Sequence, residues 1–153
     1  MARTAHQSRP QTGLRRAFSV VLAALVTAGW AGFLTFVATN PHPPVPSSSP
    51  PLGLSWGFAA HFGGYFVLAF LLTLLVEAVR GGRGAWPWAP AAAGAVAALH
   101  GGVMEVAQLW IPGRFASVQD GLVNVLGAAM GALLAWCLIV ATRQALARWN
   151  FQD

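Results

Sequence analysis

Four long stretches of the chain consist almost entirely of apolar residues, and short polar or proline-rich segments separate them. The stretches cover residues 17–39, 56–79, 89–111 and 118–141. Each is close to the ~20 residues that an α-helix needs to cross a hydrocarbon core roughly 30 Å thick. The pattern therefore predicts an all-α fold class: a polytopic membrane protein built as a bundle of four transmembrane helices.

The composition supports this fold class. Hydrophobic residues make up 56% of the chain and charged residues only 8%, where an ordinary soluble domain carries roughly 25% charged residues. The third stretch is the weakest of the four, because Pro90, His100 and Glu105 lower its hydropathy. Little of the chain remains for a soluble domain.

The basic residues are distributed unevenly around the four stretches. All nine are arginines. Eight of them fall on the same side of a four-span arrangement: Arg3, Arg9, Arg15, Arg16, Arg80, Arg83, Arg143 and Arg148. By the positive-inside rule we expect a multi-pass protein of the cell membrane (the inner or plasma membrane) with both termini in the cytoplasm. The arginines lie beside membrane spans without aromatic interleaving, so we expect membrane lipid as a partner and no nucleic acid.

The domain boundaries follow from the same pattern. We expect residues 1–14 to form a disordered cytoplasmic tail, residues 15–142 the four-helix membrane domain, and residues 143–153 a cytoplasmic C-terminal tail. The first apolar stretch exceeds the roughly 7 to 15 residues of a signal-peptide core, which favours a retained span over a cleaved signal. Residues 40–54 are rich in proline and predict an outer loop that acts as a spacer.

Polar and ionisable residues gather at one level of this arrangement, near the outer face. Residues spaced three or four apart share one face of a helix. Three such pairs occur, one each in the second, third and fourth stretches, and the loop before the fourth stretch adds two further polar residues. The candidate pocket consists of His61, Tyr65, Glu105, Gln108, Arg114, Ser117, Asp120 and Asn124. Ionisable groups at membrane depth are costly and usually functional, so we predict a polar pocket open to the cell exterior.

Individual roles within this pocket can be suggested from the residue types. Arg114 could pair with Glu105 or Asp120, which would reduce the cost of burying either carboxylate. His61 could titrate near neutral pH and act as an acid or base. Ser117 is expected to cap the start of the fourth helix, with Asp120 at the third position after it in capping-box-like spacing. Alternatively, these groups satisfy one another and only lock the bundle.

Three other features suggest structural roles. Gly127 and Gly131 continue the polar face of the fourth helix as a stripe of small residues, which allows a neighbouring helix to approach closely. Glu77 lies near Arg80 at the inner end of the second span, and we expect these two to form an ion pair. His100 is expected to be structural, although its partner cannot be identified from the sequence.

Metal and nucleophilic chemistry find little support in the spacing of the residues. His61, Glu105 and Asp120 could together form a set of one histidine and two carboxylates, but no HExxH or paired-histidine spacing is present. We therefore expect no metal and no cofactor. Cys137 is the single cysteine, so it can form neither an intrachain disulfide nor a cysteine metal cluster. Ser117 lacks the Gly-x-Ser-x-Gly context of a nucleophile.

The order and spacing of the polar residues resemble those of the VanZ-like family. The resemblance covers about residues 17–142 and is carried by His61, Tyr65, Glu105, Gln108, Pro112, Gly113, Arg114, Ser117, Asp120, Asn124, Gly127 and Gly131. It implies a small helical membrane protein, in some members associated with resistance to the glycopeptide antibiotic teicoplanin. Family members often carry Asp-Lys just ahead of the motif histidine, where this chain has Gly57 and Phe58.

Three classes of function remain open. The first is a binding role at the cell envelope, with a cell-wall precursor, a lipid headgroup or a glycopeptide as the ligand. The second is an intramembrane enzyme acting on a lipid-linked envelope substrate, with Glu105 or Asp120 as the base and His61 as the proton carrier. The third is a structural partner of another membrane protein. The sequence does not specify the oligomeric state.

Overall fold

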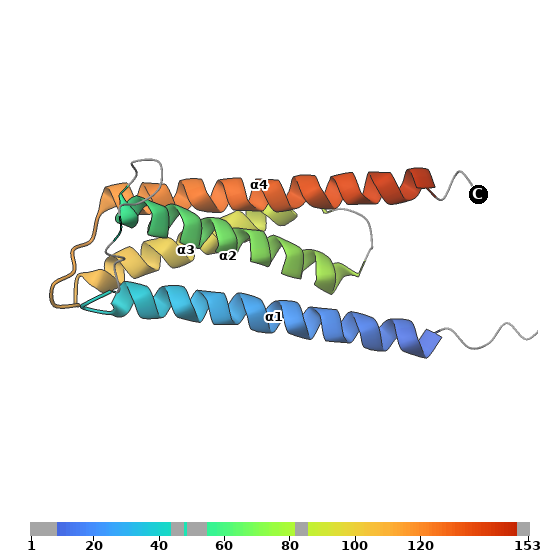
Figure 1. The fold of residues 1–153 in the computed structure, drawn as a ribbon, viewed down its shortest axis with the longest axis horizontal. Coiled ribbons are helices and arrows are strands. Elements are labelled where there is room, and N and C mark those ends of the chain that lie inside the picture. The colour runs from blue at the N-terminus through green and yellow to red at the C-terminus, as the bar shows by residue number, and fades with distance from the viewer. Residues whose placement is uncertain (1–8, 44–47, 49–54, 82–85, 150–153) are drawn as a thin grey trace, which may run out of the picture.

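The computed structural model describes residues 9–43, 48, 55–81 and 86–149. This part of the chain contains four helices: α1 (Arg9–Thr39), α2 (Trp56–Arg80), α3 (Ala89–Gln108) and α4 (Val118–Trp149). Successive helices alternate in direction (Figure 1). The last residues of α1, the first residues of α2 and the α3–α4 connection therefore lie at one end of the bundle, the loop end, and the first residues of α1 and the last of α4 lie at the other, the terminal end. The predicted all-α fold class is confirmed.

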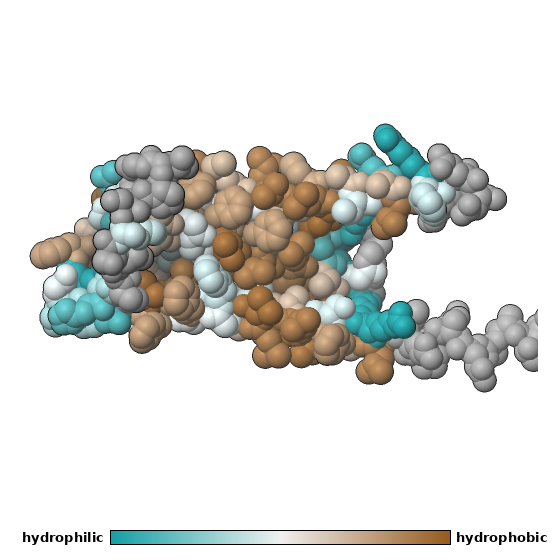
Figure 2. All heavy atoms as spheres, viewed as in Figure 1, coloured by the Kyte–Doolittle hydropathy of each residue, from teal (hydrophilic) through white to brown (hydrophobic). Residues whose placement is uncertain are grey.

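The lengths of the helices suit a bilayer. Helices α1, α2 and α4 are long and apolar enough to cross a membrane. Helix α3 has 20 residues, which at 1.5 Å per residue is about 30 Å, close to the thickness of a hydrocarbon core. It is the more polar helix that the sequence analysis identified as the weakest span. In the view of Figure 2, apolar side chains cover the middle of the bundle and hydrophilic ones gather at its two ends.

Two of the helices extend beyond the apolar stretches of the sequence. Helix α1 begins at Arg9, within the predicted N-terminal tail, and α4 continues to Trp149, within the predicted C-terminal tail. A helix satisfies its backbone hydrogen bonds internally, so it can continue past the hydrocarbon layer while its arginines reach the headgroups. Residues 1–8, 44–47, 49–54 and 150–153, which hold the rest of the tails and most of the predicted proline-rich loop, lie outside the described residues.

Helices α2 and α4 make the closest contact in the bundle. A Cβ atom added at Gly127 would overlap the carbonyl oxygen of Phe62, and one added at Gly131 would overlap that of Phe66. Both glycines of α4 therefore lie directly against the backbone of α2, as in the close approaches that small residues permit in membrane bundles. Helix α3 packs on both α2 and α4, whereas α1 contacts α2 and, over a smaller area, α3.

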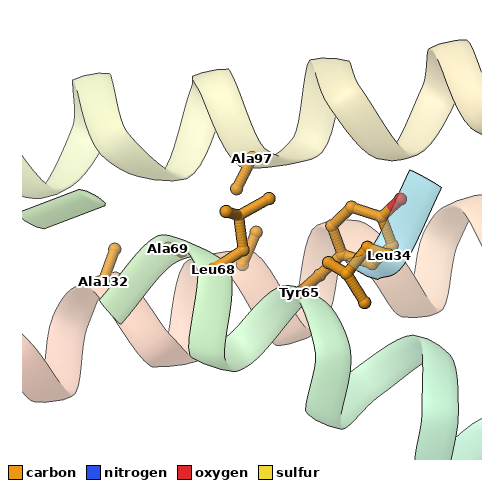
Figure 3. Close-up of a cluster of buried hydrophobic side chains, with 7 residues drawn as sticks. Leu34, Tyr65, Leu68, Ala69, Ala97 and Ala132 are labelled. Carbon is orange, nitrogen blue, oxygen red and sulfur yellow. The ribbon is translucent and has the colours of Figure 1, made fainter. Parts of the chain in front are cut away.

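The core between the helices is built mainly from small side chains. Figure 3 shows Leu34 of α1, Leu68 of α2 and Ala97 of α3 converging on one cluster. The complete cluster of buried residues is Leu34, Tyr65, Leu68, Ala69, Ala97, Ala128 and Ala132. Because several of these residues are alanines, the helix axes can come close together, and this narrow spacing brings polar side chains at the loop end within reach of one another.

An ion pair joins α2 to α4 near the terminal end. Glu77 is buried, and its Oε2 accepts a hydrogen bond of 2.6 Å from Arg143 Nη2. The expectation that Arg80 is the partner of Glu77 was therefore wrong. The guanidinium of Arg80 lies over the ring of Trp86 instead, 5.4 Å from its centroid, while the α2–α4 contact brings Arg143 to the carboxylate.

Candidate functional site

The site lies at the loop end, where α2, α3 and α4 each contribute side chains. The structure brings together four of the residues predicted from the sequence: His61, Glu105, Asp120 and Asn124. One ligand-capable atom from each of His61, Glu105 and Asp120 lies within 4.8 Å of the others. These three residues and Asn124 are called the His61 cluster below.

His61 is the centre of this cluster. Its Nδ1 lies 3.0 Å from Asn124 Oδ1 and 3.7 Å from Glu105 Oε1. Its Nε2 lies 3.9 Å from Asp120 Oδ2. An amide oxygen only accepts hydrogen bonds, so Nδ1 carries a proton and donates it to Asn124. In the neutral imidazole, Nε2 then has the free lone pair and faces the carboxylate of Asp120.

Glu105 connects this cluster to the start of α4. Its Oε2 accepts a hydrogen bond of 3.0 Å from the backbone N–H of Ser117, while its Oε1 is buried and has no hydrogen-bond partner among the described residues. Ser117 Oγ in turn accepts from the backbone N–H of Asp120 at 3.2 Å, which is the geometry of a helix N-cap. In a capping box the N–H of Ser117 would bind the side chain of Asp120, but here Glu105 takes it.

Arg114 lies in the α3–α4 connection, directly after Gly113, whose φ of 78° is in the left-handed region that favours glycine. One orientation of the Gln108 side-chain amide satisfies both of its neighbours. In this orientation its oxygen accepts a hydrogen bond from Arg114 Nη2 at 3.2 Å, and its nitrogen donates to the carbonyl of Phe115 at 3.2 Å. Among the described residues, no ion pair joins Arg114 to Glu105 or Asp120. The expected ion pair is thus replaced by an amide contact, because Gln108 is buried beside the loop.

Tyr65 belongs to a second polar network, which extends toward α1. Its hydroxyl lies 3.2 Å from His100 Nδ1, and His100 Nε2 lies 3.1 Å from Thr35 Oγ1. The Thr35 hydroxyl donates its single proton to the carbonyl of Ala31 at 3.0 Å, so it must accept from His100 Nε2. Nδ1 of His100 is then the acceptor for the Tyr65 hydroxyl. Every hydrogen bond in this network has one donor and one acceptor.

The sequence analysis missed Thr35 altogether and found no partner for His100. A threonine in an apolar helix commonly binds the carbonyl four residues earlier, so its type alone carries no signal. Gly101 is a further contributor. A Cβ atom at this position would lie 3.0 Å from Asn124 Cβ and 3.2 Å from the ring of Tyr65, so the absence of a side chain lets α3 approach both networks.

A cavity of about 210 Å³ opens beside the two networks. One side is apolar and comes from the end of α1, with Leu34, Val37 and Ala38. The other side is polar and carries five of the predicted pocket residues: His61, Tyr65, Glu105, Gln108 and Arg114. Three predicted pocket residues are not part of the cavity lining: Ser117, Asp120 and Asn124. The hydrogen bonds described above connect them to residues that line the cavity or to one another. The pocket is therefore amphipathic.

Comparison with known proteins supports the resemblance found in the sequence. A family model described as VanZ/LLP1 matches residues 23–140. This range includes most of α1, all of α2 and α3, most of α4 and every residue of the candidate site. No match was found among curated proteins or among solved structures.

Proposed function

This chain belongs to the VanZ/LLP1 family, and from that premise we propose that its loop-end pocket binds the anionic headgroup of a cell-envelope lipid. The family match and the apolar helices make it a membrane protein. The identity of the ligand is inferred from the chemistry of the pocket.

The observation that carries this proposal is the two-sided lining of the pocket. Ligands with an apolar and a polar part are held by sites that offer both kinds of surface. Leu34 and Val37 of α1 provide the apolar side, and most of the surface of α1 is exposed and would contact acyl chains. An acyl or polyprenyl chain can lie along this helix while its headgroup enters the pocket.

Arg114 is the group suited to hold the anionic part of the headgroup. It is partly buried and lines the cavity, and its buried Nε has no hydrogen-bond partner in the described ranges of the chain. A guanidinium offers five N–H donors in a planar fork that matches phosphate or carboxylate oxygens. Gln108 occupies one of these donors, and no further hydrogen bond of the guanidinium is found within the described residues.

The distribution of charge supports an outward-facing pocket in the cell membrane. Among the described residues, Arg15, Arg16, Arg80, Arg143 and Arg148 lie toward the terminal end of the bundle, and Arg114 lies at the loop end. With the positive-inside rule this arrangement supports cytoplasmic termini and a loop end on the exterior side.

The size of the cavity bears on the glycopeptide hypothesis. A volume of about 210 Å³ suits a headgroup and is small even for a drug-sized ligand, and glycopeptide antibiotics are larger still. A role in resistance to such antibiotics would therefore follow from contact with a lipid-linked cell-wall precursor and not from capture of the drug.

The proposal is tested by measuring lipid retention. Wild-type protein and Arg114→Ala, each purified in detergent, are incubated with a polyprenyl phosphate or with phosphatidylcholine, and bound lipid is measured by native mass spectrometry. We expect wild-type protein to retain the polyprenyl phosphate and not phosphatidylcholine, and Arg114→Ala to retain at least tenfold less of it. Arg148→Ala, which removes an exposed arginine at the terminal end, is the matched control. Equal retention by all three proteins would contradict the proposal.

A second candidate function, an intramembrane enzyme acting on the same lipid, is favoured by one observation. His61 lies within 4 Å of two carboxylates and lines the pocket, so an acid–base group is available beside a bound headgroup. The same incubation distinguishes the two: release of phosphate from the lipid by wild-type protein, lost in His61→Gln, would identify an enzyme. If the protein neither retains nor cleaves the lipid, the structural-partner hypothesis is preferred.

A further inference from the structure

The His61 cluster combines two carboxylates with one imidazole, and no arginine of the described residues forms an ion pair with it. Within the described part of the chain, His61 is the only basic residue with a nitrogen within 4.0 Å of Glu105 or Asp120. The two carboxylates come from different helices, α3 and α4, and meet near a membrane boundary where charge is poorly solvated. The cluster therefore carries negative charge that these contacts do not balance if His61 is neutral.

One carboxylate oxygen of Glu105 has no hydrogen-bond donor among the residues that the structure describes. The residue is only 7% exposed, and its Oε2 is anchored by the N–H of Ser117 while its Oε1 points toward His61 without a hydrogen bond. Burying a carboxylate oxygen without a donor costs free energy. The backbone contact anchors the other oxygen of the carboxylate, and Oε1 is available to a positively charged ligand.

His61 is oriented in the way that metal-binding histidines usually are. Asn124, only 1% exposed, accepts from Nδ1 through its side-chain oxygen at 3.0 Å. An outer hydrogen bond of this kind sets the tautomer and leaves the other ring nitrogen free for a metal ion. That nitrogen, Nε2, faces Asp120 Oδ2 at 3.9 Å. Both atoms are acceptors, so they cannot bond to each other.

From these contacts we propose that His61, Glu105 and Asp120 bind one divalent transition-metal cation, with Asn124 as the residue that orients His61. Neighbouring ligand atoms around a tetrahedral zinc ion lie about 3.4 Å apart, given metal–ligand bonds of about 2.1 Å. The separation of 3.9 Å between His61 Nε2 and Asp120 Oδ2 approaches this value. Glu105 Oε1 lies 3.7 Å from the other ring nitrogen, Nδ1, so side-chain rotation is needed to bring this oxygen to the same ion.

The donor set indicates the kind of cation. One imidazole nitrogen and two carboxylate oxygens suit Zn²⁺ or Mn²⁺ better than Mg²⁺ or Ca²⁺, which take oxygen ligands almost exclusively. Since His61 and Glu105 also line the cavity, the coordination positions that the protein leaves open would face the pocket. The cation could bind the same phosphate as Arg114, and it would then be part of the proposed lipid site. The proposed metal site consists of the three ligands alone and does not require a bound lipid.

The test is a titration of the full chain in detergent, with any affinity tag removed and the protein first treated with a chelator. Wild-type protein is titrated with ZnCl₂ and separately with MnCl₂ by calorimetry, and metal content after gel filtration is measured by plasma mass spectrometry. We expect one ion per chain, and at least tenfold weaker binding in Asp120→Asn and in His61→Gln. His42→Gln removes an exposed histidine at the same end of the bundle and should bind like wild type.

Asp120→Asn is the decisive variant, because the Asp120 side chain is 38% exposed and its N–H contact to Ser117 does not involve the carboxylate. Glu105→Gln is less suitable, since Glu105 also holds the N–H of Ser117. Absence of stoichiometric binding in wild type, or equal binding by Asp120→Asn, would overturn the proposal and indicate that His61 is an imidazolium neutralising both carboxylates. Metal titration needs no lipid, and lipid retention can be measured after chelation, so each proposal can fail separately.

Discussion

Two polar networks meet at the loop end, and they differ in whether their hydrogen bonds are complete. In the network of Thr35, His100 and Tyr65 each donor has an acceptor. In the His61 cluster, Glu105 Oε1 and Asn124 Nδ2 are buried and find no partner in the part of the chain that the structure describes. Buried polar atoms without a hydrogen-bond partner cost free energy and are uncommon. Their presence therefore favours the His61 cluster as a ligand site over the network of Thr35, His100 and Tyr65.

At the terminal end, the buried ion pair of Glu77 and Arg143 allows a prediction about stability. Arg143→Met removes the only hydrogen-bond partner seen for the Glu77 carboxylate in the described residues. We expect this variant to be destabilised by about 3–5 kcal/mol, because it leaves an uncompensated buried charge. The measurement is thermal or denaturant unfolding of the purified protein in detergent.

A double variant provides the control for this prediction. In Glu77→Leu/Arg143→Met the unpaired charge is gone, so most of the lost stability should return, as replacing a buried ion pair by apolar residues is often neutral. If Arg143→Met has the same free energy of unfolding as wild type, the ion pair contributes nothing to stability and the Glu77 carboxylate is solvated.

At the level of single residues, the sequence indicated which side chains matter but not their partners. Helical spacing identified Glu105 and Asp120 correctly as neighbours at one level of the bundle, since that follows from depth alone. Arg114 was expected beside a carboxylate and instead contacts Gln108, and Glu77 is paired with Arg143 and not Arg80. Partner choice depends on which helix faces which, and the spacing along one chain segment does not contain that information.

Among the helices, α2 and α4 form the contact on which the site depends. The glycine stripe of α4 allows its backbone to touch that of α2, and the same face places Asn124 against His61. In a bilayer there is little hydrophobic drive between helices, so close van der Waals packing has to supply the association. The position of the His61 cluster is thus a consequence of small residues two turns away.

This contact predicts a large effect for Gly131→Leu. A Cβ atom at this position already overlaps the carbonyl oxygen of Phe66, so the larger side chain forces α2 and α4 apart. We expect a loss of more than about 3 kcal/mol, above the usual range for overpacking because the obstacle is backbone. Folded protein would be measured by fluorescence-detected size-exclusion chromatography after expression.

Gly29→Leu is the matched control, because a Cβ atom at Gly29 meets nothing within 4 Å and the residue is exposed on α1. It should accumulate like wild type. Equal accumulation of Gly131→Leu would mean that α2 and α4 are not in backbone contact.

At the level of helices, the apolar stretches predicted the number and order of the elements well, while their ends could not be read from hydropathy. Helix α1 begins at Arg9 and α4 ends at Trp149, because a helix continues for as long as its backbone hydrogen bonds do, whatever the polarity of its side chains. The buried face of α4 was also recognisable in the sequence. Its partner was not, since a small-residue stripe fits any neighbouring helix.

For the whole molecule, the two ends of the bundle have different chemistry. The terminal end holds most of the described arginines, and the loop end holds Arg114 together with Glu105 and Asp120. Figure 2 shows hydrophilic side chains at both ends, with an apolar region between them. This asymmetry links the orientation of the chain to its proposed function, because the orientation decides which leaflet can supply a lipid to the pocket.

Orientation can be tested directly by labelling single cysteines. In a Cys137→Ala background, Phe115→Cys places a thiol in the loop beside Arg114, where the native side chain is 85% exposed. Gln144→Cys places one on the exposed surface of α4 toward the terminal end. With intact cells and a membrane-impermeant maleimide, we expect Phe115→Cys to be labelled at once and Gln144→Cys only after permeabilisation, because the positive-inside rule favours a cytoplasmic terminal end. The reverse pattern would put the His61 cluster on the cytoplasmic side, where the ligand would have to come from the inner leaflet.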